Sequence, residues 1–333
     1  MIVSRTPLRI SLGGGGTDLP FYAGKYGGSL ITAAVNKYVY LTVSPRIQKD
    51  IKLNYSQTEI VDNVADIKHH LIRESLKLTD IKTSIEIHST AELPSGSGLG
   101  SSSAFTVCLL NALNYYKGNI VSKYKLAEDA SHIMMDILKE PIGKQDQYAS
   151  AFGSLNHLKI TTDGRVTITP INITHANLKK LESNLMLFYT GFTRSANSIL
   201  GDQKKKAEKG HAGKKGIFEY YHEIKRLGEE SHRCLEIGDL RHFGELMDAH
   251  WELKRNITSR MSNDVIDNWY SIARENGAIG GKIIGAGGGG FMMLYVDKKH
   301  KKIKGLMNEQ GLVHTPFMFD FNGSIIVYDG KHF

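Results

Sequence analysis

The chain has 333 residues, of which 41% are hydrophobic and 23% charged, and this length is enough for two folded domains. Its net charge of +8 suits an anionic small substrate, while the lysines are too scattered for a nucleic-acid surface. No apolar run approaches the roughly 20 residues of a membrane span, and the first residues contain no signal-peptide core. We therefore expect a cytoplasmic protein without nucleic-acid or membrane partners.

The first half of the chain is predicted to combine strands and helices. Alternating hydrophobicity predicts strands over residues 2–12, 38–44 and 84–91 and a β-meander over 154–172. Helical spacing predicts helices over residues 66–78, 104–116 and 123–138. The only two cysteines, Cys108 and Cys234, lie in helical patterns and are expected to be buried thiols rather than a disulfide.

The second half has a helix-rich pattern. It predicts helices over residues 217–237, 240–256, 263–276 and 299–310, and strands over 185–190, 291–296, 316–321 and 324–328. The polar stretch 175–184 is typical of a boundary, so we expect an α+β protein with domains over 1–180 and 181–333.

The most informative segment is the glycine- and serine-rich stretch between the predicted strand 84–91 and the apolar helix that follows. Glycines at alternate positions allow left-handed backbone angles, and a helix N-terminus favours an anion, so this loop suits a polyphosphate. It lacks the lysine of a Walker A loop and the spacing of a dinucleotide fingerprint, and a surface linker is the alternative. The expected phosphate-binding residues are Pro94, Ser95, Gly96, Ser97, Gly98, Leu99, Gly100, Ser101, Ser102 and Ser103.

Two further glycine clusters and one carboxylate are candidates for substrate binding and catalysis. Residues 13–16 are four glycines followed by Thr17 and Asp18, and a carboxylate suits sugar hydroxyls; the alternative is a tight turn capped by Asp18. Residues 285–290 form the other cluster, which on its own also fits a strand entry. Asp146 is a candidate to orient an acceptor hydroxyl, with a helix cap as the alternative.

These elements, in this order, resemble those of the GHMP small-molecule kinases. Residues 94–102 read Pro-x-Gly-x-Gly-Leu-Gly-Ser-Ser, which is similar to the phosphate loop of that family. Residues 7–18 are similar to its first motif, residues 285–290 to its third, and residues 143–147 to the segment that carries the catalytic aspartate of galactokinases.

Within the family, the sequence motifs of the chain are most similar to those of the heptose 7-phosphate kinases. This likeness rests on residues 8–20, 143–148, 189–195 and 281–287. At Gly15 the chain departs from the Gly-Glu-His-Thr-Asp pattern of galactokinases, which argues against galactose as the substrate.

The resemblance implies two domains with the active site in the cleft between them, and ATP and Mg²⁺ as cofactors. It implies that Mg²⁺ is held by Ser102, with Ser103 as the alternative, and by a helical carboxylate. For the carboxylate, the helical stripe of residues 128, 132 and 136 offers Asp136 first and then Glu128. Because His132 lies between them, a zinc site is the competing interpretation.

The activity implied is transfer of the ATP γ-phosphoryl group to the anomeric hydroxyl of a heptose 7-phosphate, with Arg9 and Asp146 as catalytic residues. Alternatives are a kinase for an unphosphorylated sugar such as L-fucose, and a non-catalytic sugar-binding protein. The oligomeric state stays open, with a homodimer as one option. The expected substrate-binding residues are Gly14, Gly15, Gly16, Thr17, Asp18, Arg194, Lys282, Gly287 and Gly288.

Overall fold

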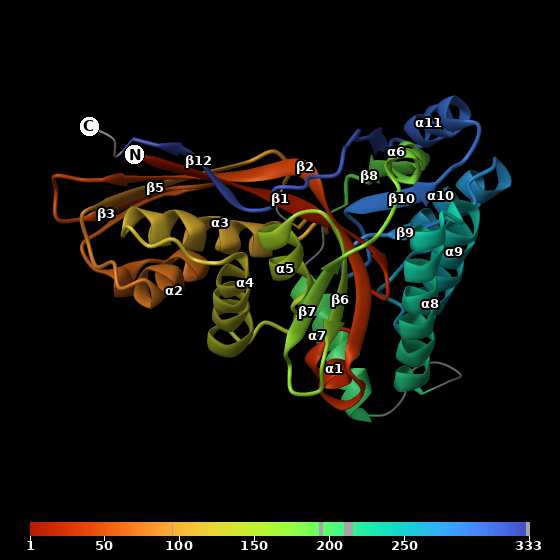
Figure 1. Cartoon of the computed structure of the whole chain (residues 1–333), viewed down its shortest axis with the longest axis horizontal. Helices are drawn as coiled ribbons and strands as arrows, with labels where there is room; N and C mark the ends of the chain where they lie inside the picture. Colours follow the sequence, from red (N-terminus) through yellow and green to blue (C-terminus); the bar gives the residue numbers. More distant parts are fainter. Residues whose placement is uncertain (95, 193–195, 210–215, 331–333) are drawn as a thin grey trace.

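The computed structural model describes residues 1–94, 96–192, 196–209 and 216–330, which form two sheets covered by helices (Figure 1). The strands of the larger sheet are β1 (Ile2–Gly13), β2 (Gly28–Pro45), β3 (Ile51–Asn54), β4 (Thr58–Val61), β5 (Ile85–Ala91), β6 (Leu155–Ile160), β7 (Val166–Pro170) and β12 (Ile325–Asp329). Their order is β12-β1-β2-β5-β3-β4, with β6 beside β2 and β7 beside β6. Every pair is antiparallel except β3 with β5.

One face of this sheet is covered by helices from the first half of the chain, as Figure 1 shows for α2 and α3. These elements are α1 (Pro20–Tyr26), η1 (Val64–Asp66), α2 (His70–Leu78), α3 (Ser101–Tyr116), α4 (Lys123–Ser131), the π-helical η2 (His132–Ile137) and α5 (Gln145–Phe152). Helix α3 is apolar around most of its circumference and is buried on two sides. Val107 and Leu110 pack against α4 and α5, while Cys108 and Leu109 pack against the sheet and α2.

The smaller sheet consists of β8 (Leu185–Tyr189), β9 (Gly280–Ile283), β10 (Phe291–Tyr295) and β11 (Val313–His314), in the antiparallel order β11-β8-β10-β9. Its helices are α6 (His175–Asn184), α7 (Ala196–Lys209), α8 (Ile217–Ile237), α9 (Leu240–Ile257), α10 (Asp264–Glu275) and α11 (His300–Glu309). Trp251 of α9 is fully buried in a core with Met292 and Leu294 of β10. The amphipathic pattern of α9 therefore packs directly on the sheet.

The two halves are in close contact. A single hydrophobic core includes Leu8 and Ile10 of β1 together with Leu187 of β8 and Met293 of β10. The last strand, β12, returns to pair with β1, and residue 180 lies inside α6. A cut at residue 180 would therefore not separate the two sheets, and the expected domain limits stay a prediction.

Several predicted elements are confirmed, notably the helices over 217–237, 240–256 and 263–276, which are α8, α9 and α10. The strand expected over 316–321 is wrong: the described structure has β11 just before it, and within it an isolated bridge between Phe319 and Val35. Both cysteines are buried free thiols, as expected. Within the described ranges, no helix combines the length and apolar character needed to cross a membrane.

Candidate active site

The glycine-rich loop leads from β5 into α3 with the backbone that its sequence predicts. Gly96, Gly98 and Gly100 have φ values of 76°, 84° and 76°, so the expected left-handed angles are confirmed. Gly100 occupies the N-cap of α3, and Ser101 begins the helix. The N–H groups at this end have no intrahelical partners, which makes the loop suitable for a phosphate group.

The third glycine cluster packs directly on this loop. A Cβ atom at Gly98 would lie 2.6 Å from the carbonyl oxygen of Ile284, and one at Gly290 would lie 2.2 Å from that of Ser97. Glycine is therefore needed on both segments because the two backbones approach too closely for side chains. The strand β1 is tied to the same loop, since the Arg9 N–H donates to the Leu99 carbonyl at 3.0 Å.

A bidentate ion pair lies beside the loop. Arg9 donates from Nε to Asp146 Oδ1 and from Nη2 to Asp146 Oδ2, both at 2.6 Å, and from Nη1 to the Gly98 carbonyl at 2.6 Å. The Arg9 side chain is 6% exposed, whereas that of Asp146 is 27% exposed and can still be reached from the pocket. Asp146 lies in the first turn of α5, whose N-cap is Lys144, so its alternative role as a helix cap is wrong.

Asp18 occupies the floor of the same pocket. Its Oδ2 accepts the Gln145 N–H at 3.1 Å, and its Oδ1 accepts the Gly16 N–H at 3.2 Å. Burial raises the pKa of Asp18 above its ordinary value, and the negative charge of Asp146 adds to this rise. The N-cap of α1 is Leu19, so Asp18 does not cap that helix.

One pocket collects most of these groups at the junction of the two halves. Among the expected site residues, those lining it are Arg9, Gly15, Gly16, Asp18, Gly96, Gly98, Gly100, Ser101, Ser102, Ser103, Asp146 and Gly287. Other polar or sulfur-containing side chains of the lining are Ser11, Met134, Glu140, Gln145, Asn197, Gln203 and Lys254. Residues from at least five separate segments therefore meet in this one pocket.

Other expected site residues do not line this pocket: Pro94, Ser97, Leu99, Gly14, Thr17, Lys282, Gly288 and Asp136. Thr17 shapes the turn below it, donating from Oγ1 to the carbonyls of Gly14 at 2.8 Å and Ser29 at 3.0 Å. Lys282 is 2% exposed and donates from Nζ to the Leu12 carbonyl at 3.1 Å, so it points behind the wall of the pocket. Ser95 and Arg194 fall outside the described residues.

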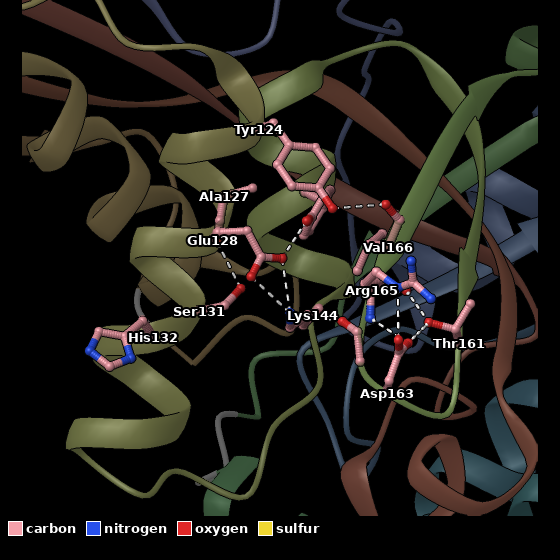
Figure 2. Close-up of polar contacts among 12 residues, drawn as sticks. Tyr124, Ala127, Glu128, Ser131, His132, Lys144, Thr161, Asp163, Arg165 and Val166 are labelled. Atoms are coloured by element: carbon pink, nitrogen blue, oxygen red, sulfur yellow. Dashed lines mark hydrogen bonds and ion pairs between the residues drawn. The ribbon is translucent and has the colours of Figure 1, made fainter.

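The structure places the stripe of residues 128, 132 and 136 outside the pocket. The Asp136 side chain is 68% exposed and bonds to His132 Nδ1 at 2.9 Å, away from the phosphate loop. Glu128 instead points toward Lys144, and Figure 2 shows His132 turned the other way. The described residues contain no group of three or more His, Cys, Asp or Glu side chains placed to hold a metal, so the zinc interpretation has no geometric support.

Glu140 is a third carboxylate in the pocket lining, besides Asp18 and Asp146. Its side chain is 14% exposed, lines the same pocket as Ser102, and lies 3.8 Å from His70 Nε2. Burial raises the pKa of Glu140 above its ordinary value. A hydroxyl and a carboxylate beside a phosphate site are hard oxygen ligands of the kind Mg²⁺ takes, so these residues fit the implied ion.

Lys144 fixes the segment that carries Gln145 and Asp146 (Figure 2). Its Nζ donates to both carboxylate oxygens of Glu128 at 2.9 Å and to the Gly164 carbonyl at 3.0 Å. The Tyr148 hydroxyl donates to the same Glu128 carboxylate. The start of α5 is therefore tied to α4 and to the turn between β6 and β7, on the side opposite the pocket.

Several lining residues were missed by the sequence analysis, among them Ser11, Gln145, Lys254 and the Glu140 described above. Ser11 directly precedes the first glycine cluster and Gln145 directly precedes Asp146, so proximity to a motif could have indicated both. Lys254 has no such signal, because it is one lysine in the amphipathic pattern of α9. Burial lowers the pKa of Lys254 to about 8.

Comparisons with known proteins point to one family. The GHMP kinases N terminal domain matches residues 61–154, and the GHMP kinases C terminal domain matches residues 231–305. The D-glycero-alpha-D-manno-heptose 7-phosphate kinase of Campylobacter jejuni is 32% identical over 97% of both chains. A galactokinase of Pyrococcus furiosus is 28% identical over 91% of both chains.

Solved structures show the same fold. A structure described as a D-glycero-D-manno-heptose 1-phosphate kinase from Bacteroides thetaiotaomicron superposes with a TM-score of 0.81 at 24% identity, over 99% of this chain and 100% of that one. The mevalonate kinase of Methanococcus jannaschii gives a TM-score of 0.72 at 19% identity, over 95% and 98% of the two chains. The chain therefore belongs to the GHMP kinase family and is a carbohydrate kinase.

Proposed function

We propose that this chain transfers the γ-phosphoryl group of ATP to the anomeric hydroxyl of D-glycero-D-manno-heptose 7-phosphate, giving the 1,7-bisphosphate. The observation that carries the proposal is the Arg9–Asp146 pair, held at 2.6 Å within the pocket that the phosphate loop lines. The identity with the Campylobacter jejuni enzyme, 32% over 97% of the chain, supports this choice of sugar.

In this proposal Asp146 accepts or orients the acceptor hydroxyl, because its carboxylate faces the pocket and lies beside Gly100 of the phosphate loop. A positioned carboxylate of this kind contributes typically 10²–10⁴-fold to a rate. Arg9 holds both carboxylate oxygens, which leaves the outer lone pairs directed toward the pocket. Its fixed positive charge also favours the negative charge that spreads over the transferred group.

In this proposal the phosphate loop and α3 bind the nucleotide. Loop N–H groups and the α3 N-terminus would bind the ATP phosphates, with the hydroxyls of Ser101, Ser102 and Ser103 on the same wall. Ser102 and Glu140 would hold Mg²⁺, which supplies charge neutralisation for the phosphates when bound. Asp18, with both oxygens fixed by backbone N–H groups, would accept hydrogen bonds from sugar hydroxyls.

The choice of Glu140 over Asp136 is tested by a pair of matched variants. Glu140→Gln removes a buried carboxylate from the pocket, whereas Asp136→Asn removes an exposed one outside it. We expect the Mg²⁺ concentration for half-maximal rate to rise at least tenfold in Glu140→Gln and to stay unchanged in Asp136→Asn. The reverse result would return the metal to Asp136, and Ser102→Ala beside Ser103→Ala identifies the hydroxyl in the same titration.

The proposed substrate is tested by supplying the purified chain with MgATP and a panel of free and phosphorylated sugars, heptose 7-phosphate and L-fucose included. ADP release measures the rate, and phosphorus NMR locates the new phosphate. We expect the highest kcat/KM for heptose 7-phosphate and a product phosphorylated at the anomeric oxygen. Equal kcat/KM for the free heptose, or a phosphate at another carbon, would refute the proposal and leave a kinase of unphosphorylated sugars.

A further inference from the structure

Lys254 is a partly buried cation that lines the pocket. It extends from α9, and its Nζ donates to the Gly285 carbonyl at 3.3 Å. Within the described part of the chain, no carboxylate lies within ion-pair distance of it. A cation removed from water is unfavourable unless a negative group compensates it, so this position is poised for an anion.

The charges around Lys254 leave a local positive excess. Arg9 is neutralised by Asp146, and Asp18 is the negative group that favours charged Lys254. Lys282 on β9 and His250 on α9 lie behind it, 3.3 Å apart, and neither has a carboxylate partner among the described residues. Asp18 therefore offsets the positive charge of Lys254, whereas Lys254 and Arg9 both disfavour a charge on the buried Lys282.

Two further polar side chains in the same pocket have no protein partner. Ser11 Oγ and Gln145 Nε2 are both buried, and neither forms a hydrogen bond within the described structure. Gly15 keeps this corner open, since a Cβ atom there would lie 2.5 Å from Ser11 Oγ. Buried polar atoms of native proteins are normally hydrogen-bonded, so this corner is built for a polar ligand.

We infer that Lys254, Ser11 and Gln145 form the acceptor subsite, in which Lys254 binds a phosphoryl group of the acceptor and the other two bind its hydroxyls. The inference rests on the proposed function and adds Lys254 to the substrate-binding residues, where the sequence analysis named Arg194 and Lys282 as the basic ones. The proposed function assigns the loop N–H groups at α3 to the nucleotide, and Lys254 interacts electrostatically with Asp18, which it assigns to the sugar. An acceptor that carries its own phosphate supplies the missing negative charge.

A proton linkage follows from the same environment. Burial lowers the pKa of Lys254 to about 8; Asp18 opposes this shift and Arg9 adds to it. A bound phosphate favours the protonated amine, so phosphate binding raises that pKa. The affinity for a phosphorylated acceptor should therefore fall as the pH rises above about 8, and binding at pH 8.5 should take up protons.

The test compares Lys254→Met with Lys206→Met. Lys206 is a matched control because its Nζ also donates to a backbone carbonyl, that of Ile257, at 3.3 Å, but lies outside the pocket. Calorimetry measures the Kd of heptose 7-phosphate in the absence of nucleotide. A second titration measures the Kd of a non-hydrolysable ATP analogue in the presence of Mg²⁺. Loss of one partner of a desolvated charge pair corresponds to roughly 30-fold or more.

We expect the Kd of heptose 7-phosphate to rise at least about 30-fold in Lys254→Met, with the nucleotide Kd within threefold of the wild type and Lys206→Met unchanged. A larger effect on the nucleotide would assign Lys254 to the ATP phosphates and overturn the inference. If the wild type phosphorylates heptose 7-phosphate and Lys254→Met binds this sugar with the wild-type Kd, the inference about Lys254 is wrong but the proposed function stands. If the wild type prefers free sugars, the inference and the proposed function fail together.

Discussion

Gly143→Ala adds one methyl group at the point where the α5 segment meets the floor of the pocket. A Cβ atom there would lie 2.0 Å from Asp18 Oδ2, 2.4 Å from Asp18 Cγ and 2.7 Å from the Asp18 carbonyl oxygen. Ordinary contacts of a Cβ begin at 3.4 Å, so the two segments must separate by about 1 Å or more. The Asp18 carboxylate cannot simply turn away, because the backbone carbonyl is also too close and Gln145 N–H holds Oδ2.

The same displacement would reach Asp146, three residues along the chain. A misplacement of about 1 Å in an active site costs roughly 100-fold in rate, so we expect kcat to fall by about that factor. Overpacking of this kind also lowers the free energy of unfolding by about 1–3 kcal/mol, which thermal unfolding would report. Steady-state kinetics with saturating MgATP and sugar phosphate provide the assay, at a temperature where the variant is folded.

Gly24→Ala is the matched control. Gly24 lies inside α1, has no atom within 4 Å of a built Cβ, and gains helix propensity from the substitution. We expect its kcat to equal that of the wild type. If Gly143→Ala retains kcat within threefold of Gly24→Ala while both are folded, the close contact between Gly143 and Asp18 does not control the geometry of Asp146, and the reasoning is refuted.

Three other predictions concern the Asp146 carboxylate, the Lys144 side chain that positions it, and the stability of the fold at acidic pH. Asp146→Asn should lose roughly 10²–10⁴-fold in kcat while the Kd of an ATP analogue is unchanged, and turnover close to that of the wild type would remove Asp146 from the chemistry. Lys144→Met should lower kcat about tenfold without changing KM for ATP. The Lys144 side chain pairs with Glu128 of α4, and the control variant Lys125→Met breaks the Lys125–Asp129 pair on that helix. If the two variants lower kcat equally, Lys144 does not position Asp146. Burial lowers the pKa of His157 to about 4, so the unfolded chain takes up a proton that the folded chain does not. The free energy of unfolding should therefore decrease as the pH falls from about 6.5 to 4, by up to about 1.4 kcal/mol per pH unit, and a pH series of denaturant unfolding should show a smaller decrease in His157→Gln.

Local features of the chain could be predicted because they depend on near neighbours in the sequence. Alternate glycines at 96, 98 and 100 specify left-handed angles, since other residues pay a steric cost there. The long helices α8, α9 and α10 follow from apolar residues at helical spacing, and their limits are within a residue or so of those expected. The order of the glycine motifs was enough to indicate the family.

The contacts within the pocket depend on tertiary structure. Arg9 and Asp146 are 137 residues apart, and sequence spacing alone cannot bring them to 2.6 Å. Lys254 and Lys282 are both lysines in ordinary amphipathic or strand patterns, and only packing decides that one lines the pocket while the other points behind its wall. Burial, which lowers the pKa of both Lys254 and Lys282, is a property of the folded chain.

The proposed exchange of Asp136 for Glu140 as the metal ligand illustrates what sequence periodicity cannot predict. A period of 100° per residue places residues 128, 132 and 136 on one stripe, but the chain is π-helical over His132–Ile137. His132 and Asp136 still lie on one face of this segment, since they bond at 2.9 Å, but that face points to the solvent. Neighbouring residues alone were enough to predict the phosphate loop, the long helices and the family. Only the packing of distant segments could show that Glu140 enters the pocket while Asp136 faces the solvent, because burial depends on the whole folded chain.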